Sequence, residues 1–245
     1  MPRLSVRPAP TFEAANPLPL RELYRVSPLS FLGSISNGVI QGAFWGMGAV
    51  YGASIGLSVG WISLFMASAT VGAGVLQWPI GHVSDVIDRR KVLAGITLLG
   101  ALVCVAAGLL SGETPIALIA ATGLFGGLAL PIYSLCVAQA NDYLKPEQMV
   151  AGSSGLVLLY GCGSIFGPVS ASAVMAVFGP NGFFWWLAVL MGGLALFTFY
   201  RMIARAPKPV GEQGPYVPVV PRRSPLAASA LEEAASGEAD GARPT

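Results

Sequence analysis

Long apolar runs separated by short charged loops are the feature that most limits what this chain can fold into. Only 11% of the residues are charged, whereas a soluble domain usually carries about 25%. The charges gather at the two ends and in the loops, which leaves runs of about 20 residues, the length of a membrane-spanning helix. In hydrocarbon the backbone must satisfy its own hydrogen bonds. The sequence therefore predicts an all-α membrane protein with six transmembrane helices.

The predicted helices divide the chain into three parts. Residues 1–27 form an amino-terminal arm, residues 28–204 the six-helix transmembrane domain, and residues 205–245 a tail rich in Pro, Ala, Gly, Ser and Glu that is predicted to be disordered. The six predicted helices are 28–54, 59–81, 92–110, 115–138, 149–178 and 182–203.

Lysine and arginine predict the orientation of the helices. They occur in the arm, in the second and fourth connections and after the last helix, while the first, third and fifth connections carry no positive charge and only one charge of any kind, Glu113. Positively charged loops stay on the cytoplasmic side. We therefore expect both termini to be cytoplasmic, in an integral multi-pass protein of the bacterial inner membrane.

Several classes of activity find no support in the sequence. The cysteines Cys104, Cys136 and Cys162 lie inside apolar runs, and His82 is the one histidine, so neither a disulfide framework nor a metal site is predicted. There is no nucleotide-binding P-loop and no basic patch for nucleic acid. No Asp, Glu, Lys or Arg lies deep in a predicted helix, so this chain supplies no obvious proton-coupling group. We expect no enzyme and no cofactor.

Glycines recur at four-residue spacing in the first and fifth predicted helices. The first carries Gly38, Gly42 and Gly46, and the fifth carries Gly163 and Gly167, followed by Pro168. Small residues at this spacing let helices approach closely in lipid. Tight packing is the simpler interpretation; smooth faces that let helices slide or bend during a transport cycle are the other.

Polar side chains line one face of the first predicted helix, namely Ser34, Asn37 and Gln41, with Trp45 next on the same face. Asn37 is about nine residues into the helix, roughly 14 Å at 1.5 Å per residue. That depth is near mid-membrane, where transporters bind their substrates. These residues could line a wet cavity or bond to other helices, and Tyr133 and Tyr160 are weaker candidates for the same cavity.

A dense charged stretch, residues 81–91, separates the second and third predicted helices. It resembles the signature loop of the major facilitator superfamily (MFS), in which a glycine, an aspartate four residues later and a basic cluster follow one another. The matching residues are Gly81, Asp85, Arg89 and Arg90. Val86 stands where a basic residue is usual, and Asp88 stands where glycine is usual. The Gly163–Pro168 segment resembles the family's fifth-helix element, and Asn141-Asp142 fits the same group.

The resemblance implies a fold and a function. The six helices look like an MFS half-transporter bundle, the carboxy-terminal half, and the arm resembles the family's central linker. The implied function is transport of a small solute by alternating access; a non-transporting membrane fragment or an interaction partner of another membrane protein is the alternative. The implied partners are the lipid bilayer, an unknown small solute and either a separate amino-terminal half or a second copy of this chain.

The resemblance also implies a role for the charged stretch. Asp85, Arg89 and Arg90 would form a cytoplasmic latch, with Asp85 near the amino terminus of the fifth helix at Pro146, where the helix dipole favours a carboxylate. The alternative is that these charges only mark a cytoplasmic loop.

Overall fold

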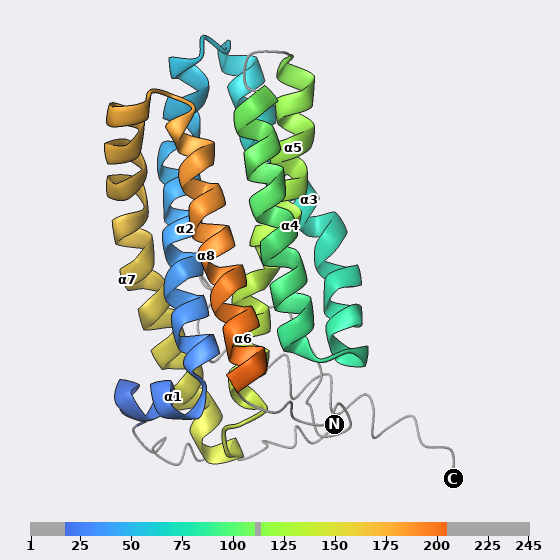
Figure 1. Ribbon diagram of the computed structural model, residues 1–245, viewed down its shortest axis with the longest axis vertical. Helices are drawn as coiled ribbons and strands as arrows, with labels where there is room; N and C mark the ends of the chain where they lie inside the picture. Colours follow the sequence, from blue (N-terminus) through green and yellow to red (C-terminus); the bar gives the residue numbers. More distant parts are fainter. Residues whose placement is uncertain (1–17, 111–113, 205–245) are drawn as a thin grey trace, which may run out of the picture.

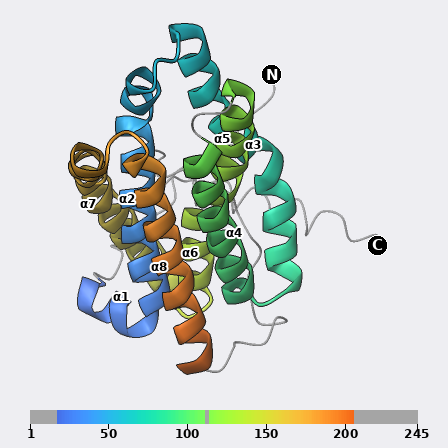
Figure 2. The ribbon, with the colours of Figure 1, turned by 45° about the horizontal axis from the view of Figure 1, so that its top comes forward.

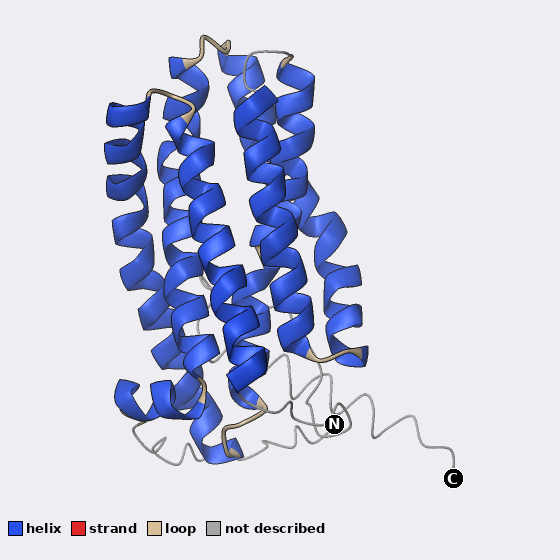
Figure 3. Ribbon diagram, in the orientation of Figure 1, coloured by secondary structure: helices blue, strands red, loops and turns tan. Residues whose placement is uncertain are grey.

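The computed structural model describes residues 18–110 and 114–204, and every regular element in these two ranges is an α-helix (Figure 3). The predicted tail, most of the arm and Glu113 lie outside the described residues. In chain order the helices are α1 (Leu20–Val26), α2 (Pro28–Ser54), α3 (Val59–Val86), α4 (Arg89–Leu110), α5 (Pro115–Ala129), α6 (Pro131–Asn141), α7 (Pro146–Phe178) and α8 (Gly182–Ala204).

Proline and glycine mark the helix boundaries. Helices α2, α5, α6 and α7 each begin on a proline, whose fixed φ suits the first helical position and whose missing N–H is not needed there. Gly56 and Gly179 follow α2 and α7 with φ values of +81° and +76°, which an L-residue with a side chain rarely adopts. The chain can therefore reverse direction within a few residues.

The all-helical bundle expected from the sequence is confirmed, with three differences in detail. A short helix, α1, precedes the first predicted segment. The fourth predicted segment is divided into α5 and α6 at Leu130–Pro131. The charged stretch is mostly helix and not loop, because α3 continues to Val86 and α4 starts at Arg89.

Within residues 18–110 and 114–204, five spans are long and apolar enough to cross a membrane: α3, α4, α5 with α6, α7 and α8. Helix α2 has a comparable length, 27 residues, but is not among these five because polar side chains interrupt its apolar sequence. It runs beside α7 and α8 through the bundle (Figure 1). Its polar face is buried against protein, which removes the need for a fully apolar surface.

The helices pair as two related sets of three. The first set is α2, α3 and α4; the second is α5 with α6, then α7 and α8. Helix α2 packs mainly against α7, α3 against α5, and α4 against α8. The first helix of each set therefore contacts the second helix of the other set, and the two third helices contact each other. Figures 1 and 2 show α3 and α7 at opposite edges of the bundle. This pairing is what an internal three-helix repeat produces.

Aromatic side chains fill the end of the bundle away from the charged stretch. Phe44 lies with its ring centroid 5.2 Å from that of Phe125, and Tyr51 stacks on Phe183 at 5.0 Å. All four are at most 1% exposed. The cluster fixes α2, α5 and α8 together, and each such aromatic pair adds about 0.5–1.5 kcal/mol beyond area burial.

Candidate functional site

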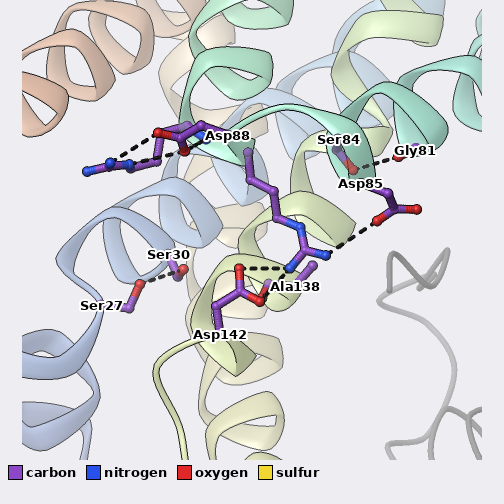
Figure 4. Close-up of polar contacts among 10 residues, drawn as sticks. Ser27, Ser30, Gly81, Ser84, Asp85, Asp88, Ala138 and Asp142 are labelled. Atoms are coloured by element: carbon purple, nitrogen blue, oxygen red, sulfur yellow. Dashed lines mark hydrogen bonds and ion pairs between the residues drawn. The ribbon is translucent and has the colours of Figure 1, made fainter. Parts of the chain in front are cut away.

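A buried arginine joins three helices at the charged end of the bundle (Figure 4). Arg89, at the start of α4, donates from Nη1 to both carboxylate oxygens of Asp142, at 2.7 and 2.8 Å, and to the carbonyl oxygen of Ala138 at 3.1 Å. Its Nη2 lies 3.4 Å from Oδ1 of Asp85, at the end of α3. The cluster therefore links the end of α3, the start of α4 and the end of α6.

The two carboxylates of this cluster lie in different surroundings. The side chains of Arg89 and Asp142 are 2% and 3% exposed, whereas that of Asp85 is 38% exposed. Removing one member of a buried ion pair costs about 3–5 kcal/mol because the other charge is left buried. An exposed pair is worth about 0–1 kcal/mol. Asp142 therefore holds Arg89 in place, and Asp85 can leave it at little cost.

Arg90 belongs to a separate pair. Its backbone N–H and its Nε and Nη2 atoms all donate to the carboxylate of Asp88, at 3.0, 3.3 and 3.1 Å. The backbone carbonyl of Asp88 accepts from Lys91 and Val92, so Asp88 is the amino-terminal cap of α4. A capping aspartate explains why this position can depart from the glycine of the family signature.

The predicted signature residues are thus only partly brought together. Asp85 and Arg89 are in contact, Arg90 bonds to Asp88, and Gly81 is buried one turn before Asp85, where its carbonyl accepts from the Ser84 hydroxyl. The sequence analysis did not assign Asp142 as the buried partner of Arg89. The sequence did carry a signal for this role, since Asp142 is a carboxylate at a helix end on the same side of the bundle as the arginine-rich connection between α3 and α4.

The amino terminus of α7 is not the neighbour that the sequence predicted for Asp85. Helix α3 packs mainly on α5 and α7 mainly on α2, and the two stand at opposite edges of the bundle (Figure 1). Asp85 instead forms an ion pair with Arg89. The proposed dipole contact with Pro146 is therefore corrected.

The polar face of α2 lies inside the bundle. Ser34, Asn37 and Gln41 are 0%, 1% and 5% exposed, so none of the three side chains faces lipid. Packing against α6, α7 and α8 suits these polar side chains better than exposure to lipid, because the neighbouring helices can supply hydrogen-bond partners that hydrocarbon lacks.

Two of these polar groups have identified partners. In the amide orientation that satisfies both of its ends, Asn37 donates to the carbonyl oxygen of Ala129 at 3.2 Å and accepts from the backbone N–H of Tyr133 at 3.3 Å. Gln41 accepts from the indole N–H of Trp45 at 2.8 Å. Asn37 thereby bridges the break between α5 and α6, and Gln41 orients Trp45.

The two predicted tyrosines form a contact between α6 and α7. The rings of Tyr133 and Tyr160 meet edge to face with centroids 5.4 Å apart. Tyr133 is 1% exposed, while Tyr160 is partly exposed. Trp45 is also partly exposed. Two buried polar residues thus each contact an aromatic residue that reaches the surface of the bundle: Gln41 contacts Trp45, and Tyr133 contacts Tyr160.

The glycine stripes meet where α2 crosses α7. A Cβ atom at Gly163 would collide with the carbonyl oxygen of Ile35, and one at Gly167 would collide with the backbone nitrogen of Ala43. On the other helix, a Cβ at Gly46 would come within 2.6 Å of the Pro168 ring. The backbones approach closely because the glycines along this line have no side chains to hold the helices apart.

Comparison with known proteins agrees with this architecture. The family described as Major Facilitator Superfamily matches residues 29–234. Among similar proteins, the uncharacterized MFS-type transporter YfkF of Bacillus subtilis (strain 168) is 28% identical over 174 residues, which are 67% of this chain and 44% of the relative. YcaD of Escherichia coli O139:H28 (strain E24377A / ETEC) is 29% identical over 190 residues, 76% of this chain and 47% of the relative.

A third relative, an uncharacterized MFS-type transporter of Yersinia pestis (strain Pestoides F), is 27% identical over 202 residues, 80% of this chain and 48% of its own length. The chain therefore spans about half the length of the curated relatives it matches. The match to the family covers most of the chain and includes the charged cluster, the glycine crossing and all the helices from α2 to α8. This integral, multi-pass membrane protein belongs to the major facilitator superfamily.

Proposed function

We propose that this chain is the carboxy-terminal six-helix half of a secondary transporter that moves a small solute by alternating access. The observation that carries the proposal is the match of one six-helix bundle to about half the length of several MFS-type transporters. The two halves of such transporters are parallel repeats that enclose the substrate between them. A second six-helix unit is therefore needed to complete the solute path.

The edges of the bundle are suited to such a unit. In the most apolar 18-residue windows of α3 and α7, 17% and 22% of the residues are buried, against 50% for α4 and α8. Helices α3 and α7 flank the bundle on opposite edges (Figure 2). A second unit laid against both edges would cover surface that this chain alone leaves open. The favoured occupant is an amino-terminal half, and a second copy of the chain is the alternative.

The solute path is proposed to run past the partly exposed aromatic residues Trp45 and Tyr160. Gln41 fixes the indole of Trp45, and Tyr133 backs the ring of Tyr160. Asn37 is buried on the same face of α2 and would act by holding α2 against α6, through its bonds to Ala129 and Tyr133, and not by touching solute.

The charged cluster is proposed to be the cytoplasmic latch. Arg89 stays paired with the buried Asp142, and the more exposed Asp85 engages or releases Arg89 as the cytoplasmic side closes or opens. Arg90 supports the latch indirectly, since its pair with Asp88 fixes the first turn of α4. This assignment places the latch on the cytoplasmic side together with both termini.

Reconstitution tests the function. The purified chain, alone and coexpressed with the amino-terminal six helices of a relative such as YcaD, is placed in proteoliposomes on a solid-supported membrane. A panel of sugars, amino acids and organic cations is then applied. We expect solute-dependent currents only when the second unit is present. If no solute gives a current in either preparation, while both halves are inserted in lipid, the non-transporting alternative is favoured.

A further inference from the structure

A small cavity opens at the charged end of the bundle, and its lining includes Arg90 and Tyr143, the chain neighbours of Arg89 and Asp142. It lies among the starts of α2 and α4 and the ends of α6 and α8, with a volume of about 20 Å³. Its lining residues are Ser27, Pro28, Leu29, Arg90, Gln139, Tyr143 and Arg201. All of these positions are at helix ends on one side of the bundle, which is the level of lipid headgroups when the helices span a bilayer.

The polar groups of this cavity are mostly hydrogen-bond donors. Arg90 and Arg201 supply guanidinium groups and Gln139 an amide, while no Asp or Glu is among the lining residues. Arg90 is 5% exposed and is balanced by its pair with Asp88. Arg201 has no ion pair or hydrogen bond within the described residues. Among the described residues, therefore, nothing compensates the positive charge that Arg201 brings to the cavity.

Gln139 brings an amide to the cavity wall. Its side chain is 94% buried, since its exposed fraction is 6%, and it forms no hydrogen bond with any other residue in the ranges 18–110 and 114–204. An amide at such a mostly buried position gains from a hydrogen-bonding group that binds beside it. A bound group that offers oxygen atoms would satisfy it.

The size and surroundings of the cavity narrow the choice of anion. A volume of about 20 Å³ holds little more than one water-sized group, so only the oxygen atoms at the tip of a larger molecule can enter. Beside Arg201 on α8, the apolar side chains of Leu196, Tyr200 and Ile203 are 73%, 63% and 89% exposed. Acyl chains could lie along them, and tyrosine at this level is typical of the membrane interface.

We propose that this cavity binds the phosphate group of an anionic phospholipid. The unesterified phosphate oxygens accept from Arg201 and Gln139, with Arg90 behind them, and the acyl chains lie on the outer surface of α8. Basic pockets between transmembrane helices bind anionic headgroups in this manner. The lipid would join the ends of α2, α4, α6 and α8, on the side of the bundle away from the edges assigned to the second six-helix unit.

Lipid titration of the full chain in detergent, followed by native mass spectrometry, tests the proposal. The probes are phosphatidylglycerol, zwitterionic phosphatidylcholine and inorganic phosphate, and the variants are Arg201→Gln and Gln139→Leu. The matched control is Lys91→Gln, which removes one positive charge at the same end of the bundle from an exposed residue that does not line the cavity.

We expect phosphatidylglycerol to bind the wild-type chain and the Lys91→Gln variant with equal affinity. Arg201→Gln should weaken binding about tenfold or more, as the loss of a charge-assisted hydrogen bond does, and Gln139→Leu should weaken it less.

Equal losses of affinity for Arg201→Gln and Lys91→Gln would show that the lipid is attracted diffusely by positive charge, and would overturn the site. Equal binding of phosphatidylcholine would overturn the need for net charge, and displacement of the lipid by millimolar inorganic phosphate would assign the cavity to a free anion instead. Arg201→Lys, which keeps the charge, separates lost binding from misfolding, because it should retain most of the affinity.

Discussion

The side chain of Asn37 on α2 bonds to the backbone N–H of Tyr133 on α6, at the point where Pro131 interrupts the helix. The same amide reaches the carbonyl oxygen of Ala129, the group to which the Tyr133 N–H would bond in an uninterrupted helix. A side chain inserted into the helical ladder is a recognised cause of a kink. Asn37 therefore holds the bend between α5 and α6 in place.

Replacing Asn37 with alanine should destabilise the bundle. Two buried backbone groups would lose their partner, at about 1–3 kcal/mol for each unsatisfied group, and the apparent melting temperature in detergent should fall. Ser34→Ala is the matched control, three residues away on the same buried face, because the Ser34 hydroxyl has no partner among the described residues. The Ser34 variant should melt at or above the wild-type temperature. Equal melting of the two variants would contradict the bridging role of Asn37.

The sequence predicted a polar face at this residue but did not decide between its two interpretations, a wet cavity and bonds to other helices. Polar residues at helical spacing on α2 correctly predicted one polar face, and the six segments were placed within a few residues because hydrophobic length is a strong signal. The sequence does not reveal whether such a face meets water, solute or another helix. That depends on which helix packs against it, and the partner here is the proline-interrupted α5–α6 segment, about 90 residues further along the chain.

Arg89 and Asp142 should tolerate substitution less well than Asp85. Asp142→Asn leaves a 2%-exposed arginine without its main countercharge, which costs about 3–5 kcal/mol. Asp85→Asn affects a pair worth about 0–1 kcal/mol. We expect poor yield or a large fall in melting temperature for the first variant and near wild-type behaviour for the second. Replacing both Arg89 and Asp142 with Met and Leu should recover part of the loss, since no charge is then left buried.

Asp85→Asn tests the proposed latch, because this variant should fold. If Asp85 holds the cytoplasmic side closed through Arg89, loss of its charge should increase the rate at which maleimide labels a cysteine placed near the end of α3, for example at Ser84, which is fully buried. The labelling needs a background in which the exposed Cys162 is replaced. The same cysteine without the Asp85 change is the control. An unchanged labelling rate at normal expression would favour the plain topological interpretation of these charges.

The pairing of charges within this cluster could not be predicted from the sequence for a similar reason. The signature spacing led to Asp85, Arg89 and Arg90, but the pairing depends on side-chain direction at the first turn of α4. Arg89 points toward α6 and Arg90 toward Asp88. Adjacent helical residues lie about 100° apart around the axis, as 3.6 residues per turn requires, so the two arginines could not share one partner.

Glycine substitutions should distinguish the α2–α7 crossing from the lipid-facing surface. Gly163→Ala places a methyl group against the Ile35 carbonyl oxygen, and overpacking of this kind costs about 1–3 kcal/mol. Gly161→Ala, two residues earlier, meets nothing within 4 Å and should be neutral or slightly stabilising, since alanine is the better helix former. Melting temperatures in detergent compare the two. Equal effects would mean that the close approach of the backbones does not limit stability.

The need for a second six-helix unit can be tested by crosslinking at the exposed edges. Gln41 is only 5% exposed, so a cysteine there would be inaccessible. Ile165 on α7 and Val75 on α3 are 70% and 65% exposed and lie on the edges assigned to the second unit. Leu196 on α8, 73% exposed, is the control on the lipid-facing side.

The experiment uses a background that lacks Cys162. A homodimer should give crosslinks between Ile165→Cys in one copy and Val75→Cys in a differently tagged copy, and should leave Leu196→Cys uncrosslinked. If the chain remains monomeric by mass in lipid and crosslinks only to a coexpressed amino-terminal half, the homodimer is excluded and the half-transporter assignment stands.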